Sequence, residues 1–244
     1  MARRWSDIAM EPNSPDAKRF RLATLAAAHA PPVASRVDHL CELVRGKRVL
    51  DVGSVAHALE TEAKDEWLHR ALAAAAGYCL GVDILPDAVR RLQEAGYNVR
   101  LCDVTREEIG ETFDVIVAGE VIEHLGEPGA FFAAARRMLV PGGRLVLTTP
   151  SPYYWKRVRN HIGLRRHRCE NVDHVTLVFP SGVAELAERA SLRLDRYQGV
   201  WADKRGARGS GLGRRMRDWV RGRVLEPEFF CETIIYECER PAAA

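Results

Sequence analysis

The stretch VLDVGSVAHALE, residues 49–60, decides how the rest of the sequence is interpreted. Its apolar first half ends in Asp51 and Gly53, as in a buried strand that turns tightly into a nucleotide-binding loop. The later glycines of such a loop are missing. The stretch is therefore a degraded cofactor site, a working site built in another way, or a core strand without a ligand.

Beyond this stretch, short apolar runs alternate with longer amphipathic segments. Strands are predicted at 48–52, 78–83, 98–103, 113–119 and 144–150. The segments between them, 60–77, 86–96 and 129–143, are rich in helix formers and end in glycine, in the last case directly after Pro141. Apolar strands that alternate with helices predict an α/β fold, with a mostly parallel sheet and helices on both faces.

The last third of the chain has a different pattern. One more helix is predicted at 181–190, with Ser181 as its N-cap. The apolar runs 192–201 and 229–239 lack a clear helical crossover between them, which predicts an antiparallel pair at the sheet edge. A Gly- and Arg-rich surface segment, helical around 214–220, is expected between these two strands.

Size and composition indicate a single globular domain. The 244 residues are 47% apolar, enough to bury a core, and no apolar run reaches membrane-spanning length. No apolar segment of a signal peptide follows the basic residues of the N-terminus, so a cytoplasmic protein is expected. The six cysteines are scattered without a CxxC pair, which predicts reduced core residues without a disulfide framework.

The positive charge is concentrated in two windows. Residues 156–168 hold six Lys or Arg and no acid, and residues 203–223 hold eight against two acids, although the net charge of the chain is only +3. These windows are expected either to meet an anionic, phosphate-bearing partner or to be solvated surface loops.

Polar residues or glycine follow four successive predicted strands. Gly53 follows the first, Asp83 and Asp103 end the second and third, and Glu120 follows the fourth. Ligands of a parallel α/β sheet bind beyond the carboxyl ends of the strands, where these residues would gather. A carboxylate at the end of the second strand can accept both hydroxyls of a ribose. The set indicates a cofactor site.

At this point a family resemblance becomes specific. The segments VLDVGSVAH, LGVDI, RLCDV, FDVIVAGEVIEHL and LVPGGRLVLTTP resemble, in order and spacing, the class I S-adenosylmethionine-dependent methyltransferases. The similarity is greatest to the branch that carries EVIEHL after the fourth strand, and it covers about residues 45–200 and 229–239. It implies a Rossmann-like sheet of seven strands, mostly parallel, with an antiparallel last strand.

The resemblance implies S-adenosylmethionine as cofactor and S-adenosylhomocysteine as product. The loop after the first strand would hold the methionine part, Asp83 the ribose hydroxyls, and Asp103 with Val104 the adenine. The full set of expected cofactor residues is Asp51, Gly53, Ser54, Val55, Asp83, Ile84, Asp103, Val104, Gly119 and Glu120.

The opening loop departs from the family pattern. The family has a GxGxG loop, whereas this chain has Gly53, Val55 and His57 at those positions. Side chains at the second and third positions exclude glycine-only backbone angles, so cofactor contacts are expected from the backbone of residues 53–55 along a different path. A site that has lost its function is the alternative. A nicotinamide dehydrogenase fits less well, because GxGxxG is absent too.

Two histidines are candidates for a general base. His124 follows the fourth strand at the crevice, and His174 follows the fifth strand, near where acceptors lie in this family. Histidine suits this role because its ordinary pKa is near the working pH. Each could instead have a structural role, ordering or packing its loop. Glu120 or Glu123 could orient one of them, although Glu123 could equally cap the following helix.

Two further groups of residues could bind a substrate or a metal ion, an aromatic cluster and a set of His and Cys residues. Tyr153, Tyr154 and Trp155 open the first basic window and could contact the substrate by stacking on a sugar or base, or form an apolar lid. No metal ligand is assigned, because His161, His167, Cys169 and His174 fit no common zinc spacing. Magnesium stays open, since some sugar methyltransferases of this fold use it.

The sequence therefore predicts a methyltransferase that acts on a small-molecule or saccharide acceptor, most readily at a hydroxyl oxygen. The alternatives are methylation of a nitrogen, methylation of nucleic acid, or a non-catalytic scaffold that kept the fold. A nucleic-acid partner is not expected, because no Asn-Pro-Pro-Tyr motif follows the fourth strand. The acceptor could be anionic, and a homodimer stays open.

Two parts of the chain are expected. Residues 1–45 would form a helical cap over the sheet, flexible up to about Arg19, with helices within 20–44. Residues 46–244 would form the methyltransferase domain, with basic insertions at about 151–173 and 201–228.

Overall fold

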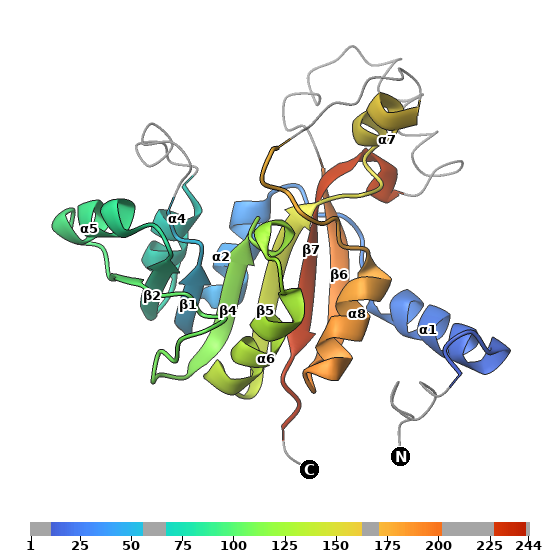
Figure 1. Ribbon diagram of the computed structural model, residues 1–244, viewed down its shortest axis with the longest axis horizontal. Coiled ribbons are helices and arrows are strands. Elements are labelled where there is room, and N and C mark those ends of the chain that lie inside the picture. Colours follow the sequence, from blue (N-terminus) through green and yellow to red (C-terminus); the bar gives the residue numbers. More distant parts are fainter. Residues whose placement is uncertain (1–10, 56–66, 163–170, 202–226, 243–244) are drawn as a thin grey trace.

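The computed structural model describes residues 11–55, 67–162, 171–201 and 227–242. A seven-stranded sheet in the order β3-β2-β1-β4-β5-β7-β6 crosses the molecule (Figure 1). The first five strands are parallel, and β7 lies antiparallel between β5 and β6. The predicted α/β fold and the antiparallel last strand are thus confirmed. The strands are β1 Arg48–Val52, β2 Tyr78–Asp83, β3 Val99–Leu101, β4 Phe113–Gly119, β5 Leu139–Pro150, β6 Arg193–Trp201 and β7 Cys231–Glu239.

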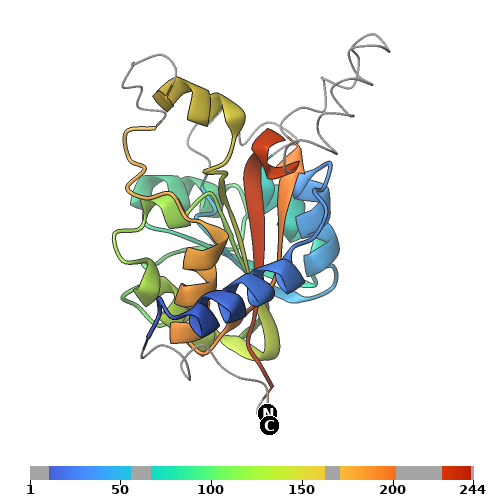
Figure 2. The same ribbon diagram turned by 90° about the vertical axis from the view of Figure 1, so that its right-hand side faces the viewer.

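Helices cover both faces of the sheet, as Figure 2 shows. On one face, α2 (Arg36–Val44) and α4 (Leu68–Ala75) bury Leu40 and Leu72 against β1, β4 and β5. On the other face, α6 (Pro128–Met138) and α8 (Pro180–Arg189) bury Phe131, Phe132 and Val183. Both faces of the central strands are therefore apolar, which is the pattern expected of a doubly covered parallel sheet.

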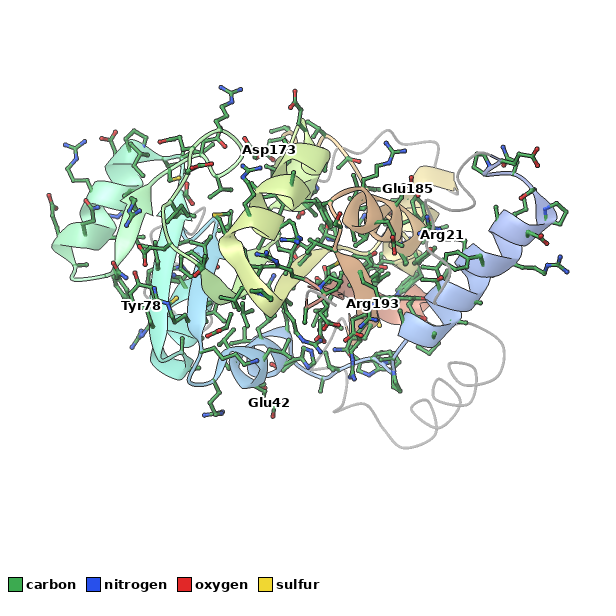
Figure 3. The ribbon with its side chains drawn as sticks, turned by 90° about the horizontal axis from the view of Figure 1, so that it is seen from below. Arg21, Glu42, Tyr78, Asp173, Glu185 and Arg193 are labelled. Carbon is green, nitrogen blue, oxygen red and sulfur yellow. The ribbon has the colours of Figure 1, made fainter. Side chains whose placement is uncertain are left out.

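The N-terminal segment packs on the sheet edge. Helix α1 (Pro15–Ala28) begins after Ser14, whose hydroxyl accepts from the backbone N–H of Ala17. An ion pair of 2.6 Å between Arg21 and Glu185 joins α1 to α8 (Figure 3). The helix starts before the range 20–44 in which helices were expected, because Ser14 caps it and Pro15 favours its first turn.

Two helix ends differ from the predictions. Helix α6 ends at Met138, and Leu139 already pairs with Phe113 of β4. Gly142, with a φ of +80°, then lies within a strand irregularity and does not terminate the helix. Ser181 is not an N-cap, because α8 begins at Pro180 and has no side-chain cap at Phe179. Proline fixes the first helical φ by itself.

The remaining described helices lie near the ends of strands. Helix α5 (Pro86–Glu94) follows β2, and α7 (Trp155–Ile162) follows β5. Two short 3-10 turns, η2 (Ile122–His124) and η4 (Pro227–Phe230), follow β4 and precede β7. No helix within the described ranges is long and apolar enough to cross a membrane. His57, much of the helix predicted at 60–77, and the one predicted at 214–220 lie outside the described residues.

Candidate active site

The carboxyl ends of β1, β2 and β4 lie side by side. In the parallel register, Val52 pairs with both Val82 and Ala118. Gly53, Asp83 and Gly119 therefore lie close together at the carboxyl ends of these strands, where a crevice is predicted.

The described start of the opening loop, residues 53–55, has a defined conformation. Gly53 has a φ of +76°, and a Cβ added there would lie 2.5 Å from Cγ2 of Val121. The backbone N–H groups of Gly53 and Ser54 donate to the carbonyl of Val82. The N–H of Val55 donates to Oδ2 of Asp83 over 3.0 Å. Gly53 is thus required twice over, by backbone angle and by space.

Asp83 links this loop to the end of β2. Its Oδ1 accepts from the N–H of Leu85 over 3.2 Å, and its Oδ2 is bound to Val55. Each carboxylate oxygen has a second lone pair, so Asp83 can still accept from ribose hydroxyls. Next to it, Ile84 is 66% exposed and Leu101 is 50% exposed, which leaves apolar surface for a flat ring.

Asp103 and Val104, the two residues predicted to contact the adenine, differ in how their side chains are placed. Asp103 accepts from the hydroxyl and the N–H of Thr105, and these bonds lower the pKa of its carboxyl. Val104 is buried in the core, so only its backbone could meet a ligand.

Two other predicted cofactor residues turn inward. Asp51 is 2% exposed and bound to His69, and Ser54 is 2% exposed with a buried hydroxyl that has no hydrogen-bond partner. Their side chains therefore support the loop from beneath, and the loop presents its backbone.

Glu120 stands in a strained conformation at the end of β4. Its φ is +57°, uncommon for a residue with a side chain. Its Oε1 accepts from Arg36 over 3.1 Å and from Thr148 over 3.2 Å. Arg36, at the start of α2, was not predicted as a site residue. The one local signal in the sequence is that Arg36 directly follows Ser35, the N-cap of α2.

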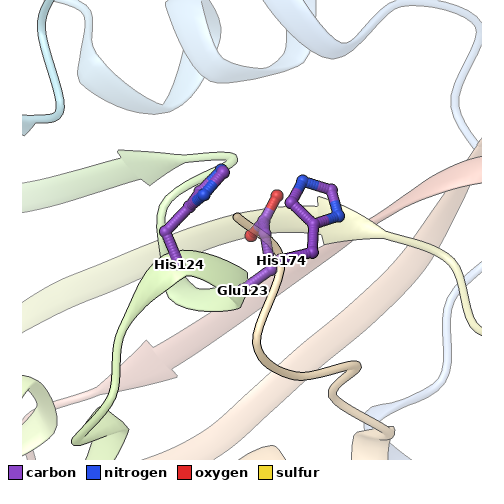
Figure 4. Close-up of side chains that lie close together, drawn as sticks. All are labelled: Glu123, His124 and His174. Atoms are coloured by element: carbon purple, nitrogen blue, oxygen red, sulfur yellow. The ribbon is translucent and has the colours of Figure 1, made fainter. Parts of the chain in front are cut away.

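Three side chains meet beyond the end of β4 (Figure 4). The rings of His124 and His174 lie 4.8 Å apart, edge to face. Nδ1 of His124 lies 3.2 Å from Oδ2 of Asp173. The carbonyl of Glu123 accepts from the N–H groups of Val175 and Thr176. The two predicted histidines are thus brought together, although they come from segments on either side of β5.

Glu123 is the buried member of this group. Its side chain is fully buried, its Oε2 accepts from Thr149 over 3.0 Å, and its Oε1 has no hydrogen-bond partner. Burial and the nearby Glu120 raise its pKa to about 7. The alternative role as a helix cap is wrong, because α6 begins at Pro128 after Glu127. Glu123 lies beside His124 and His174 in the candidate site.

The pKa of His174 is shifted in the opposite direction to that of Glu123. Burial, with the neighbouring His124, lowers the pKa of His174. An imidazole with a lowered pKa is neutral near pH 7 and can accept a proton.

Glu123, His124 and His174 could also hold a metal ion. Each offers a ligand atom, and these atoms all lie within 4.8 Å of one another. Two imidazoles and one carboxylate suit a transition metal better than magnesium, which prefers oxygen ligands.

The predicted aromatic residues divide between core and surface. Tyr154 is buried, whereas Tyr153 is 38% exposed and packs edge to face on Phe179, with ring centroids 5.5 Å apart. The ring of Trp155 lies beneath the charged ends of Lys156 and Arg159, at 5.9 and 5.0 Å. Tyr153 and Trp155 therefore stay candidates for acceptor contacts.

Comparisons with known proteins identify related sequences and folds. A family model described as a methyltransferase domain matches residues 26–196. A ubiquinone biosynthesis O-methyltransferase of Pseudomonas fluorescens is 34% identical over 124 residues, which cover 47% of this chain and 50% of that protein. One from Dechloromonas aromatica is 26% identical over 179 residues, 68% of this chain and 73% of that protein. The chain thus spans about half the length of the first of these relatives.

Solved structures show the same fold at low identity. A SAM-dependent methyltransferase from Archaeoglobus fulgidus aligns with a TM-score of 0.60 at 17% identity, covering 84% of this chain and 91% of that one. A magnesium protoporphyrin IX methyltransferase from Synechocystis, with bound SAH, aligns with a TM-score of 0.56 at 15% identity, covering 96% and 99%.

The family match and the fold define this chain as a class I methyltransferase domain, the class that uses S-adenosylmethionine. The chain belongs to the methyltransferase domain family. The residues present fit this cofactor. Gly53 leaves space that a Cβ would fill, and Asp83 keeps acceptor capacity beside the exposed Ile84.

Proposed function

We propose that this protein transfers a methyl group from S-adenosylmethionine to a hydroxyl oxygen of a small-molecule or saccharide acceptor. The main support for the proposal is that His124 and His174 are in contact beyond the carboxyl ends of the strands, on the side of the sheet where Gly53 and Asp83 also lie. The names of the relatives, ubiquinone biosynthesis O-methyltransferases, support oxygen as the methylated atom.

The cofactor would be held by the strand ends. The backbone of residues 53–55 would contact the methionine part, with Arg36 available for its carboxylate. Asp83 would accept the ribose hydroxyls, and Ile84, Asp103 and the backbone of Val104 would border the adenine. Gly119 and Glu120 would close the pocket beside Arg36. When bound, S-adenosylmethionine supplies an electrophilic methyl group on a sulfonium sulfur.

The protein's own groups then have two tasks, alignment and proton removal. An acceptor held between Tyr153 and the histidines would be oriented for in-line attack. The neutral ring of His174 would take the hydroxyl proton as the oxygen attacks, because a lowered pKa leaves it unprotonated. His124, beside Asp173, would hold the position of that ring or share the proton.

Cofactor binding is tested first. We expect calorimetric titration to show micromolar binding of S-adenosylmethionine, which Asp83→Ala weakens by about tenfold or more, since hydrogen bonds to a charged group are lost. The control is Asp87→Ala, at a side chain that is 90% exposed on α5. If the wild-type protein does not bind the cofactor, the proposal fails and the non-catalytic scaffold is favoured.

The base is tested second, by formation of S-adenosylhomocysteine with a panel of phenols and saccharides. His174→Ala and His124→Ala are each expected to lower turnover about 100-fold without changing cofactor affinity. His29→Ala is the control, because His29 pairs with Glu228 at the end of α1. Unchanged turnover would remove that histidine from the mechanism.

A further inference from the structure

A fully buried pair of polar side chains lies beneath the opening loop. Nδ1 of His69 is 2.9 Å from Oδ2 of Asp51, and the two side chains are 1% and 2% exposed. Asp51 belongs to β1, and His69 belongs to the first turn of α4. When Asp51 is ionised, its carboxylate can only accept, and the imidazole then donates this hydrogen bond from Nδ1.

The same end of α4 supports the loop backbone. Nε1 of Trp67 donates to the carbonyl of Ser54 over 3.0 Å, and the ring of Trp67 lies 5.4 Å from that of His69. A Cβ added to Gly81 of β2 would lie 2.6 Å from Cε1 of His69 and 2.8 Å from Cβ of Ser54. His69 therefore fills the space between the loop and the strand on which the loop lies.

We infer that His69 is a positioning residue of the cofactor site. Together with Trp67, it holds Asp51 and the backbone of residues 53–55 in the conformation that binds S-adenosylmethionine. The inference rests on the proposal that this loop carries the cofactor.

The hydrogen bond also affects the charge of Asp51. Burial raises the pKa of Asp51, and the hydrogen bond from His69 is the main effect that lowers it. Without that donor, the carboxylate would be buried without a close partner, and the protonated acid would be favoured. S-adenosylmethionine carries positive charge on its sulfonium and ammonium groups, so an ionised Asp51 at the end of β1 favours its binding.

Two substitutions separate the hydrogen bond from the ring. His69→Phe keeps an aromatic ring beside Trp67 but cannot donate. His69→Asn loses the ring, but its amide nitrogen can occupy the place of Nδ1 and donate to Asp51. We expect His69→Phe to weaken S-adenosylmethionine binding by about tenfold or more in calorimetry, since a charged hydrogen bond is lost, and His69→Asn to weaken it less than threefold.

The outcomes decide between positioning and packing. Equal losses in both variants, or wild-type affinity in His69→Phe, would overturn the inference. If His69→Phe does not fold, His69→Met is measured in its place, because it also fills the space with an apolar side chain that cannot donate to Asp51. The same tenfold loss is expected, and unchanged affinity would overturn the inference.

Hydrogen exchange without any ligand gives an independent measurement. In the wild-type protein the N–H groups of residues 53–55 are bonded to Val82 and Asp83, so they are expected to exchange slowly. In His69→Phe they should exchange at least tenfold faster, while the N–H groups of β4 stay protected. Exchange as slow as in the wild type would overturn the positioning role. Failure of the wild-type protein to bind the cofactor would instead overturn the proposed function.

Discussion

Gly53 is the residue on which the opening loop depends. Gly53→Ala would place a left-handed residue against Val121, whose Cγ2 would be 2.5 Å from the new Cβ. Gly96→Ala is a matched control, because its φ is +86° and nothing lies within 4 Å of an added Cβ. We expect the control to lose about 1 kcal/mol of unfolding free energy and Gly53→Ala a further 1 to 3 kcal/mol, roughly, in urea unfolding. Equal losses would show that Val121 moves aside.

Glu123 makes stability depend on pH. Its carboxyl has a pKa of about 7 in the folded protein and an ordinary value of 4.5. Below the lower value both states are protonated. Between the two values only the unfolded chain releases the proton, so the unfolding free energy falls as pH rises, by on the order of 3 kcal/mol in full.

Glu123→Gln should remove this dependence. Between about pH 5 and pH 8, the variant is expected to lose less stability than the wild-type protein, because the amide does not ionise. Urea unfolding across this range measures the difference. If the unfolding free energy changed with pH in the same way in both proteins, the folded environment would not oppose ionisation of Glu123.

The sequence predicted those site residues that follow strands or belong to a recognisable motif. His124 and His174 are examples, and the structure brings them into contact. It could not predict residues whose role depends on contacts between separate elements. Arg36 reaches Glu120 from 84 positions away in the sequence, and the segment that carries His174 donates hydrogen bonds to the carbonyl of Glu123. No local pattern encodes either contact.

At the scale of elements, residues 173–176 act as a strap across η2. The N–H of Val175 donates to the carbonyl of Glu123 over 2.9 Å, which fixes the neighbouring His174. Val175→Pro removes this donor and restricts the preceding residue. We expect the strap to detach in this variant. The pKa of His174, which burial and His124 lower in the wild-type protein, should then rise toward its ordinary value.

Nuclear magnetic resonance titration of the imidazole protons measures this change. Val175→Ala is the control, because it keeps the N–H and should leave the pKa of His174 low. A lowered pKa in Val175→Pro would show that the strap is held by other contacts.

Element types were easier to predict than element ends. Apolar runs in the sequence predicted the strands well, because the central strands are buried on both faces of the sheet. The end of α6 was misplaced because Pro141 and Gly142 are helix-ending residues that here lie in β5. Pairing of Leu139 with Phe113 decided the boundary, and that pairing is a tertiary contact.

At the scale of the whole molecule, β7 completes the sheet. It is hydrogen-bonded to β5 on one side and β6 on the other, and it buries Ile234, Ile235 and Tyr236. A chain that ends at Phe230 should lose about 1.5 to 3 kcal/mol for each of these side chains, a large part of a typical domain's stability. We expect it not to fold, as measured by circular dichroism and thermal unfolding. A control that ends at Ala242 should fold normally, and a cooperative transition in the shorter chain would contradict this account.

This place for β7 has a consequence for synthesis. The edges of β5 and β6 that face each other stay unpaired until β7 has left the ribosome, although the other six strands of the sheet all precede β7 in the sequence. Nascent chains would therefore expose two unpaired strand edges until β7 has been synthesised, and such edges invite association between chains. The protein is expected to need chaperones most in that interval, and codons that slow translation just before β7 should lower its soluble yield.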